Sequence, residues 1–144
     1  MINDSEKPHK SIWALAAALA CVGAGQSTVF ILIPSEVRDL GFSEFEVGLI
    51  FSISALAWMF FSPFWGRLSD RFGRGSIFLI GMLGFAISMA SFAAILISAK
   101  NFLLPLTLVF PLLVFTRLIN GLLGSAVRPA AGGRIADLTS PTTR

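Results

Sequence analysis

Four long apolar segments, separated by short polar ones, dominate the pattern of side chains along this chain. They cover residues 11–33, 44–65, 76–98 and 103–133. Each is close to, or longer than, the roughly 20 apolar residues that cross the hydrocarbon core of a bilayer as one helix. The polar segments between them are too short to fold as separate domains. The pattern therefore predicts an all-α membrane protein with four transmembrane helices.

The first ten residues are polar and are typical of a short cytoplasmic tail, residues 1–10. Two lysines before an apolar run, followed by Ala-Leu-Ala-Cys at residues 18–21, also fit a secretory signal peptide. A cleaved signal would not need the apolar residues that continue from Cys21 to Ile33. We therefore interpret this segment as the first membrane helix, with Cys21 as a small buried residue, and signal cleavage as the alternative.

The charges of the polar segments predict which side of the membrane each one faces. The first loop, residues 34–46, has four acidic residues and one arginine, and the third connection, residues 100–101, has a single lysine. The second connection has three arginines, and further arginines follow the fourth helix. Short loops rich in Lys and Arg stay in the cytoplasm. We therefore expect a multi-pass protein of the cell membrane, with both chain ends and the second connection cytoplasmic.

A capping signal marks where the second helix begins. Ser43-Glu44-Phe45-Glu46 has the S-x-x-E form of a capping box, in which the serine and the glutamate each satisfy a free backbone N–H. The second helix is therefore predicted to begin near Glu44.

The composition excludes several classes of function. Hydrophobic residues make up 55% and charged residues 13%, whereas soluble domains have about 25% charged residues. The net charge of +3 comes from basic residues at helix ends, which indicates orientation in the bilayer and not a nucleic-acid partner. One cysteine and one histidine offer no disulfide framework and no metal site. We expect no cofactor and no enzymatic activity, because no nucleophile, base or metal cluster can be assembled.

The charged turn between the second and third apolar segments combines arginines, an acid and glycines in nine residues, Gly66–Arg74. Three arginines alone would fix the cytoplasmic side and need no further role. They do not account for Asp70 among them, nor for Gly66 and Gly73, which permit a tight reversal. An acid at a helix end is stabilised by the N-terminus of a neighbouring helix or by a fixed arginine. We interpret the turn as a charged latch between moving parts, with a pure topology signal as the alternative.

Arg117 lies within the fourth apolar segment, where a charge costs several kcal/mol unless it faces water or a partner. At about 100° per residue, Arg117, Gly121, Gly124 and Arg128 fall within roughly 60° of one another on a helix. This face predicts a helix that lines an aqueous central cavity. The alternative is that Arg117 reaches the outer interface while the glycines only pack.

Few other polar groups lie within the apolar segments. Gln26 and Asn120 are the main candidates to share a cavity with Arg117, and no acidic residue lies deep in any segment. Proton relays in transporters usually need a buried carboxylate. A proton-carrying acid would therefore have to come from elsewhere.

Several motifs resemble the major facilitator superfamily of transporters over nearly the whole chain. The turn matches the signature loop of that family at Gly66, Asp70, Gly73 and Arg74, although Gly75 stands where the family usually has a second basic residue. The exit from the first helix and the entry to the second are similar at Ile33-Pro34, Leu40–Ser43 and Val47-Gly48. Arg117, Gly121 and Gly124, with Pro129, resemble the fourth-helix motif of proton-driven members.

The resemblance is closest to the twelve-helix drug and metabolite proton antiporters. It implies that residues 11–144 form the first part of the N-terminal six-helix half of this fold, and that the chain is an N-terminal fragment unlikely to transport alone. It also implies proton-coupled efflux of small molecules by alternating access, with protons, the lipid bilayer and the remaining helices as partners. The implied latch residues are Gly66, Asp70, Arg71, Gly73 and Arg74, and the implied cavity and proton-coupling residues are Gln26, Arg117, Asn120, Gly121 and Gly124.

Two other classes have a suitable length. A small four-helix multidrug exporter that works as a dimer would need a glutamate in its first helix, and residues 11–33 contain none. A structural or regulatory four-helix membrane protein would explain the length, but not Arg117 beside a glycine face.

Overall fold

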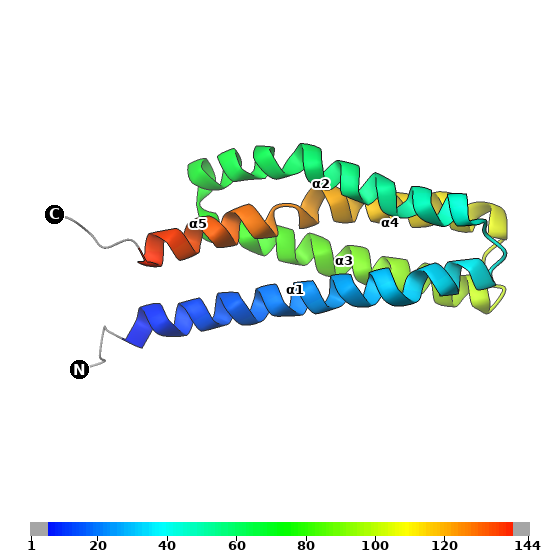
Figure 1. Cartoon of the computed structure of the whole chain (residues 1–144), viewed down its shortest axis with the longest axis horizontal. Helices are drawn as coiled ribbons and strands as arrows, with labels where there is room; N and C mark the ends of the chain where they lie inside the picture. The colour runs from blue at the N-terminus through cyan, green and yellow to red at the C-terminus, as the bar shows by residue number, and fades with distance from the viewer. Residues whose placement is uncertain (1–5, 140–144) are drawn as a thin grey trace.

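The computed structural model describes residues 6–139, with side-chain positions for residues 12–133 and for Ile135. The described chain is helical throughout, apart from short connections, in the order α1 (Glu6–Asp39), α2 (Glu44–Phe72), α3 (Arg74–Lys100), α4 (Leu106–Gly124) and α5 (Val127–Thr139). Figure 1 shows the helices running back and forth along one long axis. The start of α1, the end of α5 and the α2–α3 turn lie at one end, and the other two connections lie at the opposite end.

The prediction of four membrane-spanning segments is confirmed. Within the described residues, four helical stretches are long and apolar enough to cross a bilayer, and the last, Leu106–Gly133, includes α4 and the first half of α5. Large hydrophobic side chains remain exposed along these helices, as expected for surfaces that face lipid. Examples are Ile31, Met59, Phe60, Leu83 and Ile87, each at least 60% exposed.

The first three helices are longer than the sequence pattern predicted. Helix α1 begins at Glu6, within the predicted tail, and continues past Pro34 to Asp39. A proline inside a helix removes one N–H donor and crowds the carbonyl four residues before it, but the helix can continue where packing holds it, as the buried Val37 does here. The predicted loop of residues 34–46 is therefore reduced to a short connection ahead of Glu44. Cys21, expected to be buried, is exposed on α1.

The charged turn is mostly helix, which the sequence pattern did not predict. Helix α2 continues through Phe72, and α3 begins at Arg74, so Gly73 alone separates the two helices. Gly73 has φ +96°, a conformation that side chains with a Cβ rarely adopt. The reversal is therefore sharper than a loop of nine residues would give.

The predicted continuous helix of residues 103–133 is wrong at both its start and its middle. Helix α4 begins at Leu106, after Pro105, which is in an extended conformation. A proline disfavours the helical conformation in the residue before it, which favours a helix start after Pro105 over one at Leu103 or Leu104. The helix then breaks at Ser125 and Ala126 before α5 begins at Val127.

Helix α4 packs against both α2 and α3, whereas α1 makes the fewest contacts with the rest of the bundle. The largest core cluster lies toward the end that carries the α1–α2 and α3–α4 connections, and all four long helices contribute to it. Its buried members are Val37, Val47, Ile50, Phe92, Leu96, Ala99, Val109 and Leu113. A second cluster, around Trp65, Ile77, Ala126 and Ala130, joins α2 and α3 to the region of the helix break.

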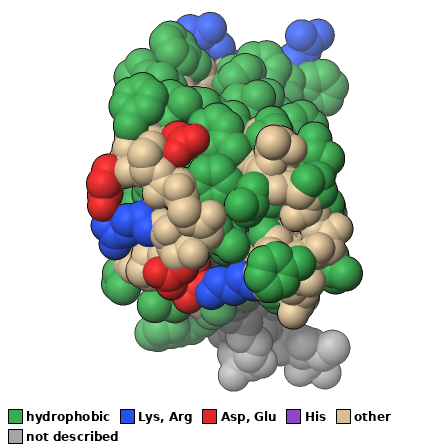
Figure 2. All heavy atoms as spheres, turned by 90° about the vertical axis from the view of Figure 1, so that its right-hand side faces the viewer, with side chains coloured by type: hydrophobic (Ala, Val, Ile, Leu, Met, Phe, Trp, Pro, Cys, Tyr) green, Lys and Arg blue, Asp and Glu red, His purple; other side chains and the backbone are tan. Residues whose placement is uncertain are grey.

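Figure 2 looks onto the end that carries these two connections, where acidic and basic side chains gather among hydrophobic ones. Arg38 forms an ion pair with Glu44 at 2.7 Å, and Lys100 forms one with Glu36. The predicted capping box is present: Ser43 Oγ accepts a hydrogen bond from the Glu46 N–H, and the Ser43 N–H donates to Glu46 Oε2 at 2.8 Å. These contacts fix the start of α2 against the end of α1.

Candidate functional site

A cavity of about 260 Å³ opens between α1, α2 and the α4–α5 segment. Aromatic rings form much of its wall, and the rings of Phe30 and Phe51 stack with their centroids 5.2 Å apart. Polar and charged groups from four helices, α1, α2, α4 and α5, also face it. The lining residues are Gln26, Phe30, Phe51, Ser54, Ala55, Trp58, Arg117 and Arg128.

Arg117 is fully buried inside the bundle and lines this cavity. Its guanidinium lies over the Phe92 ring, 4.1 Å from the centroid, and Nη2 lies 3.8 Å from Met89 Sδ. Nε and Nη1 have no hydrogen-bond partner among the described residues. The interpretation in which Arg117 reaches the outer interface is therefore wrong. A buried cation whose donors are unused is costly, so this site favours an anion or water next to Arg117.

Gln26 lies on α1 and lines the same cavity, as the sequence pattern predicted. Its Oε1 is buried without a partner in the described chain. The indole Nε1 of Trp58, on α2, is likewise buried without a hydrogen-bond partner among the described residues. The cavity thus offers an unused hydrogen-bond acceptor, on Gln26, and an unused donor, on Trp58, to a molecule that enters it.

Asn120, Gly121 and Gly124 do not line the cavity, contrary to the prediction. Asn120 is buried behind it, where Nδ2 donates to Ser54 Oγ at 3.3 Å. Gly121 lies in the contact between α4 and α2, where a Cβ would come within 2.5 Å of the Ala57 Cβ. A helix face rich in glycine lets a neighbouring backbone approach closely, and α2 occupies that space instead of water.

Arg128, on the first turn of α5, lies over the Trp58 ring with its guanidinium carbon 5.3 Å from the centroid. Unlike Arg117, it is exposed. The two arginines of the predicted face therefore reach the same cavity from opposite sides of the helix break. Cations and aromatic faces attract one another, which holds Arg128 at the edge of the cavity.

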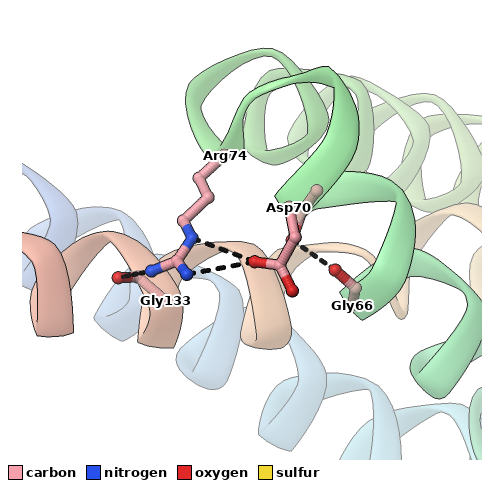
Figure 3. A network of polar contacts seen from close by, with 5 residues as sticks. Gly66, Asp70, Arg74 and Gly133 are labelled. Carbon is pink, nitrogen blue, oxygen red and sulfur yellow. Dashed lines mark hydrogen bonds and ion pairs between the residues drawn. The ribbon is translucent and has the colours of Figure 1, made fainter.

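The charged turn forms a second cluster, shown in Figure 3, which joins three helices. Arg74, at the start of α3, contacts Asp70 of α2 with Nη2 3.0 Å and Nε 3.3 Å from Oδ1. Its Nη1 donates to the backbone carbonyl of Gly133 on α5. A Cβ at Gly133 would lie 2.7 Å from the guanidinium, so this glycine makes room for Arg74.

The remaining latch residues have smaller roles in the cluster. The carbonyl of Gly66 accepts a hydrogen bond from Ser69 Oγ at 2.8 Å, and the position of its missing Cβ lies 3.8 Å from Pro129 Cβ. Gly73 provides the turn. Arg71 is exposed, and its guanidinium lies 5.5 Å from the ring of its neighbour Phe72. Among the predicted residues, Asp70 and Arg74 therefore carry the contact between helices.

Comparison with known proteins places this geometry in a family. The model of the Major Facilitator Superfamily matches residues 15–144, which include both clusters. The chain belongs to the major facilitator superfamily. The four long helices correspond to an N-terminal part of the fold of this superfamily.

Curated proteins that are similar to this chain are drug-resistance proteins by name. The chain is 30% identical over 131 residues to the quinolone resistance protein NorA of Staphylococcus aureus, an alignment that covers 91% of the chain and 31% of the relative. It is 27% identical over 139 residues to multidrug resistance protein 1 of Bacillus subtilis, covering 96% of the chain and 33% of the relative. The chain thus spans about a third of the length of these superfamily members. No solved structure matches it.

Sequence reasoning missed the aromatic wall of the cavity. Phe30, Phe51 and Trp58 are three of many aromatic residues in the apolar segments, and nothing in their spacing separates them from residues that face lipid. Arg128, in contrast, was placed by the sequence pattern on the same helix face as Arg117, and it lines the cavity.

Proposed function

We propose that this chain forms the first four membrane helices of a proton-coupled transporter that exports small aromatic molecules, such as drugs or metabolites, by alternating access. The observation that carries the proposal is the buried Arg117, which lines a cavity and has two nitrogens without partners in the described chain. A passive helix bundle has no reason to keep such a charge. The names of the two relatives, which refer to quinolone and multidrug resistance, support the same class of cargo.

The chemistry of the cavity wall supports a flat aromatic substrate. Phe30, Phe51 and Trp58 offer ring faces for stacking, which adds affinity beyond the burial of apolar area. Gln26 offers an unused acceptor and Trp58 an unused donor, and such groups fix the orientation of a ligand in a mostly apolar pocket. A volume of about 260 Å³ is only part of a site for a drug-sized molecule, so the remaining helices would supply the rest.

Proton coupling would work through the charge of Arg117. No carboxylate is among the residues that line the cavity in the described part of the chain. An acid from the remaining helices, placed against Arg117, would be held in its ionised form by the opposite charge. Protonation of that acid would remove the counter-charge and leave Arg117 buried and uncompensated, which would favour the other access state.

The Asp70–Arg74 contact would act as the latch on the cytoplasmic side. Arg74 holds α2, α3 and α5 together at the end of the bundle where α1 starts and α5 ends, and we expect this end in the cytoplasm. Ion pairs and hydrogen bonds that form in only one access state bias the equilibrium between the two states. We accordingly propose that the protein lies in the cell membrane with its N-terminus in the cytoplasm.

The test replaces Arg117 in a full-length transporter that contains this chain. We expect Arg117→Ala to abolish substrate-driven proton movement in membrane vesicles while substrate binding persists. Arg117→Lys should retain only part of the coupling, because lysine keeps the charge but loses the planar set of donors. The matched control is Arg38→Ala, which removes an exposed arginine in the last turn of α1 that does not line the cavity.

Transport is normalised to the amount of protein in the membrane. Normal coupled transport per molecule in Arg117→Ala would contradict the proposal. Low abundance with normal transport per molecule would make Arg117 a structural residue only.

A further inference from the structure

The break between α4 and α5 changes the hydrogen bonding of the helix at its most buried point. The N–H of Ala126 donates to the carbonyl of Leu123 at 3.1 Å, whereas a continuous α-helix would use the carbonyl of Leu122. Ser125, Ala126 and Val127 are all fully buried. Within a membrane bundle, water is not available to satisfy a carbonyl that loses its helical donor.

A side chain from another helix satisfies the carbonyl of Leu122. The indole Nε1 of Trp65, on α2, donates to it at 2.6 Å, and Ser125 Oγ donates to it at 3.0 Å. Trp65 is only 8% exposed, so its N–H has little access to solvent. The Trp65 indole therefore supplies a hydrogen bond to the carbonyl that lost its helical donor at the break, and this carbonyl is the acceptor for the buried indole N–H.

Helix α5 is held at two further places. The carbonyl of Gly133 accepts a hydrogen bond from Arg74, at the start of α3. At the break itself, Gly81 of α3 has no side chain, and a Cβ there would lie 2.9 Å from Val127 Cγ2 and 3.0 Å from the Val127 nitrogen. Helix α5 thus has specific contacts at its start and near its middle, and a break in the hydrogen-bond ladder separates it from α4.

Arg128 connects this segment to the cavity. It is the second residue of α5, and its guanidinium lies over the Trp58 ring at the cavity edge. Arg117 lies on α4, before the break. A tilt of α5 about the break would therefore move Arg128 relative to Trp58 while Arg117 stays in place.

We propose that the Ser125–Ala126 break is a hinge, and that Trp65 is the positioning residue that holds α5 in its present orientation through the carbonyl of Leu122. Opening of the hinge moves the Arg128 edge of the cavity and the Arg74–Gly133 contact together. This goes beyond the proposed function, because it requires neither a substrate nor a proton. Sharp changes in helix direction occur where the hydrogen-bond ladder is interrupted, and such positions can take up a rotation.

The experiment measures distances between spin labels in the 144-residue chain, reconstituted in lipid nanodiscs with Cys21→Ser as background. One pair is attached at Ser76 on α3 and Gly132 on α5, both exposed, and Gly132 has open space around its Cβ position. The reference pair is attached at Phe60 on α2 and Leu83 on α3, which are 69% and 63% exposed. The first pair reports the orientation of α5, and the second reports the packing of α2 on α3.

Trp65→Phe keeps an aromatic ring and removes the N–H donor. We expect a second, longer Ser76–Gly132 distance whose population rises about fivefold, as the loss of one buried hydrogen bond would give. Ser125→Ala removes the other donor to the same carbonyl and should shift the same pair in the same direction. The control Trp13→Phe, at a 73% exposed position on α1, should leave both pairs unchanged.

Two outcomes would overturn the proposal. An unchanged Ser76–Gly132 distance in Trp65→Phe would show that the hydrogen bond does not hold α5. Equal changes in both pairs would show that Trp65 only stabilises the bundle as a whole. If Trp65→Phe fails to fold, Ser125→Ala decides, because it must shift the Ser76–Gly132 pair alone.

Discussion

Replacement of Gly121 by alanine tests how α4 packs against α2. A Cβ at this position would lie 2.5 Å from the Ala57 Cβ and 2.7 Å from the Ser54 carbonyl oxygen, whereas ordinary contacts begin at 3.4 Å. The Ala57 Cβ would therefore have to move about 0.9 Å away from a Cβ at residue 121 to reach an ordinary contact distance. Neither obstacle can rotate away, because one is a backbone atom and the other is a Cβ. Helix α2 must therefore move as a unit.

The net cost follows from two opposing effects. Overpacking of a well-packed contact costs about 1–3 kcal/mol. Alanine is intrinsically better than glycine within a helix by about 0.5–1 kcal/mol, which offsets part of that cost. We expect Gly121→Ala to lower the free energy of unfolding by about 0.5–2 kcal/mol. The Asn120–Ser54 hydrogen bond, at 3.3 Å, should lengthen as the helices separate.

The measurement is unfolding of the purified chain in mixed micelles, followed by circular dichroism as the denaturing detergent is increased. Gly48→Ala is the matched control, since Gly48 is exposed on α2 and nothing lies within 4 Å of its Cβ position. This variant should be as stable as the parent chain or more so. If Gly121→Ala is as stable as Gly48→Ala, the close contact between α2 and α4 is refuted, and with it the explanation of why Gly121 lies outside the cavity.

Two further predictions concern the charged turn and the topology. Asp70→Asn should change the stability of the chain by less than about 1 kcal/mol, since the Asp70 side chain is 64% exposed and exposed ion pairs contribute little. In a full-length transporter, the same change should strongly reduce transport at normal protein levels, and unchanged transport would limit Asp70 to a role in topology. In the Cys21→Ser background, a membrane-impermeant thiol reagent added to intact cells should label Phe102→Cys, at a 95% exposed position, and spare Phe72→Cys, at a 62% exposed one. The reverse labelling would invert the proposed orientation.

The helix break and the charged turn show what local sequence signals leave open. The turn was recognised from its glycines and charges, which were interpreted as signals of a loop. Most of these residues are nevertheless helical, because their charges and Gly66 are tolerated in a helix and only Gly73 has to leave it. Pro129 marks the break at Ser125–Ala126 in the sequence, because a proline has no N–H for the carbonyl four residues before it, here that of Ser125, and crowds that carbonyl. The contact with Trp65 is not marked, because Trp65 lies 57 positions before Leu122 and no local pattern contains such a contact.

The sequence by itself determined the number of membrane segments and the capping box, and it singled out Arg117 as a candidate residue of a cavity. These features depend on hydrophobicity, charge and short spacings, which are properties of neighbouring residues. Only the tertiary structure decided that Gly121 packs against Ala57, that Arg128 lies over Trp58, and that Arg74 reaches Gly133. Which face of a helix meets another helix and which meets a cavity depends on how side chains from distant segments fill the same space.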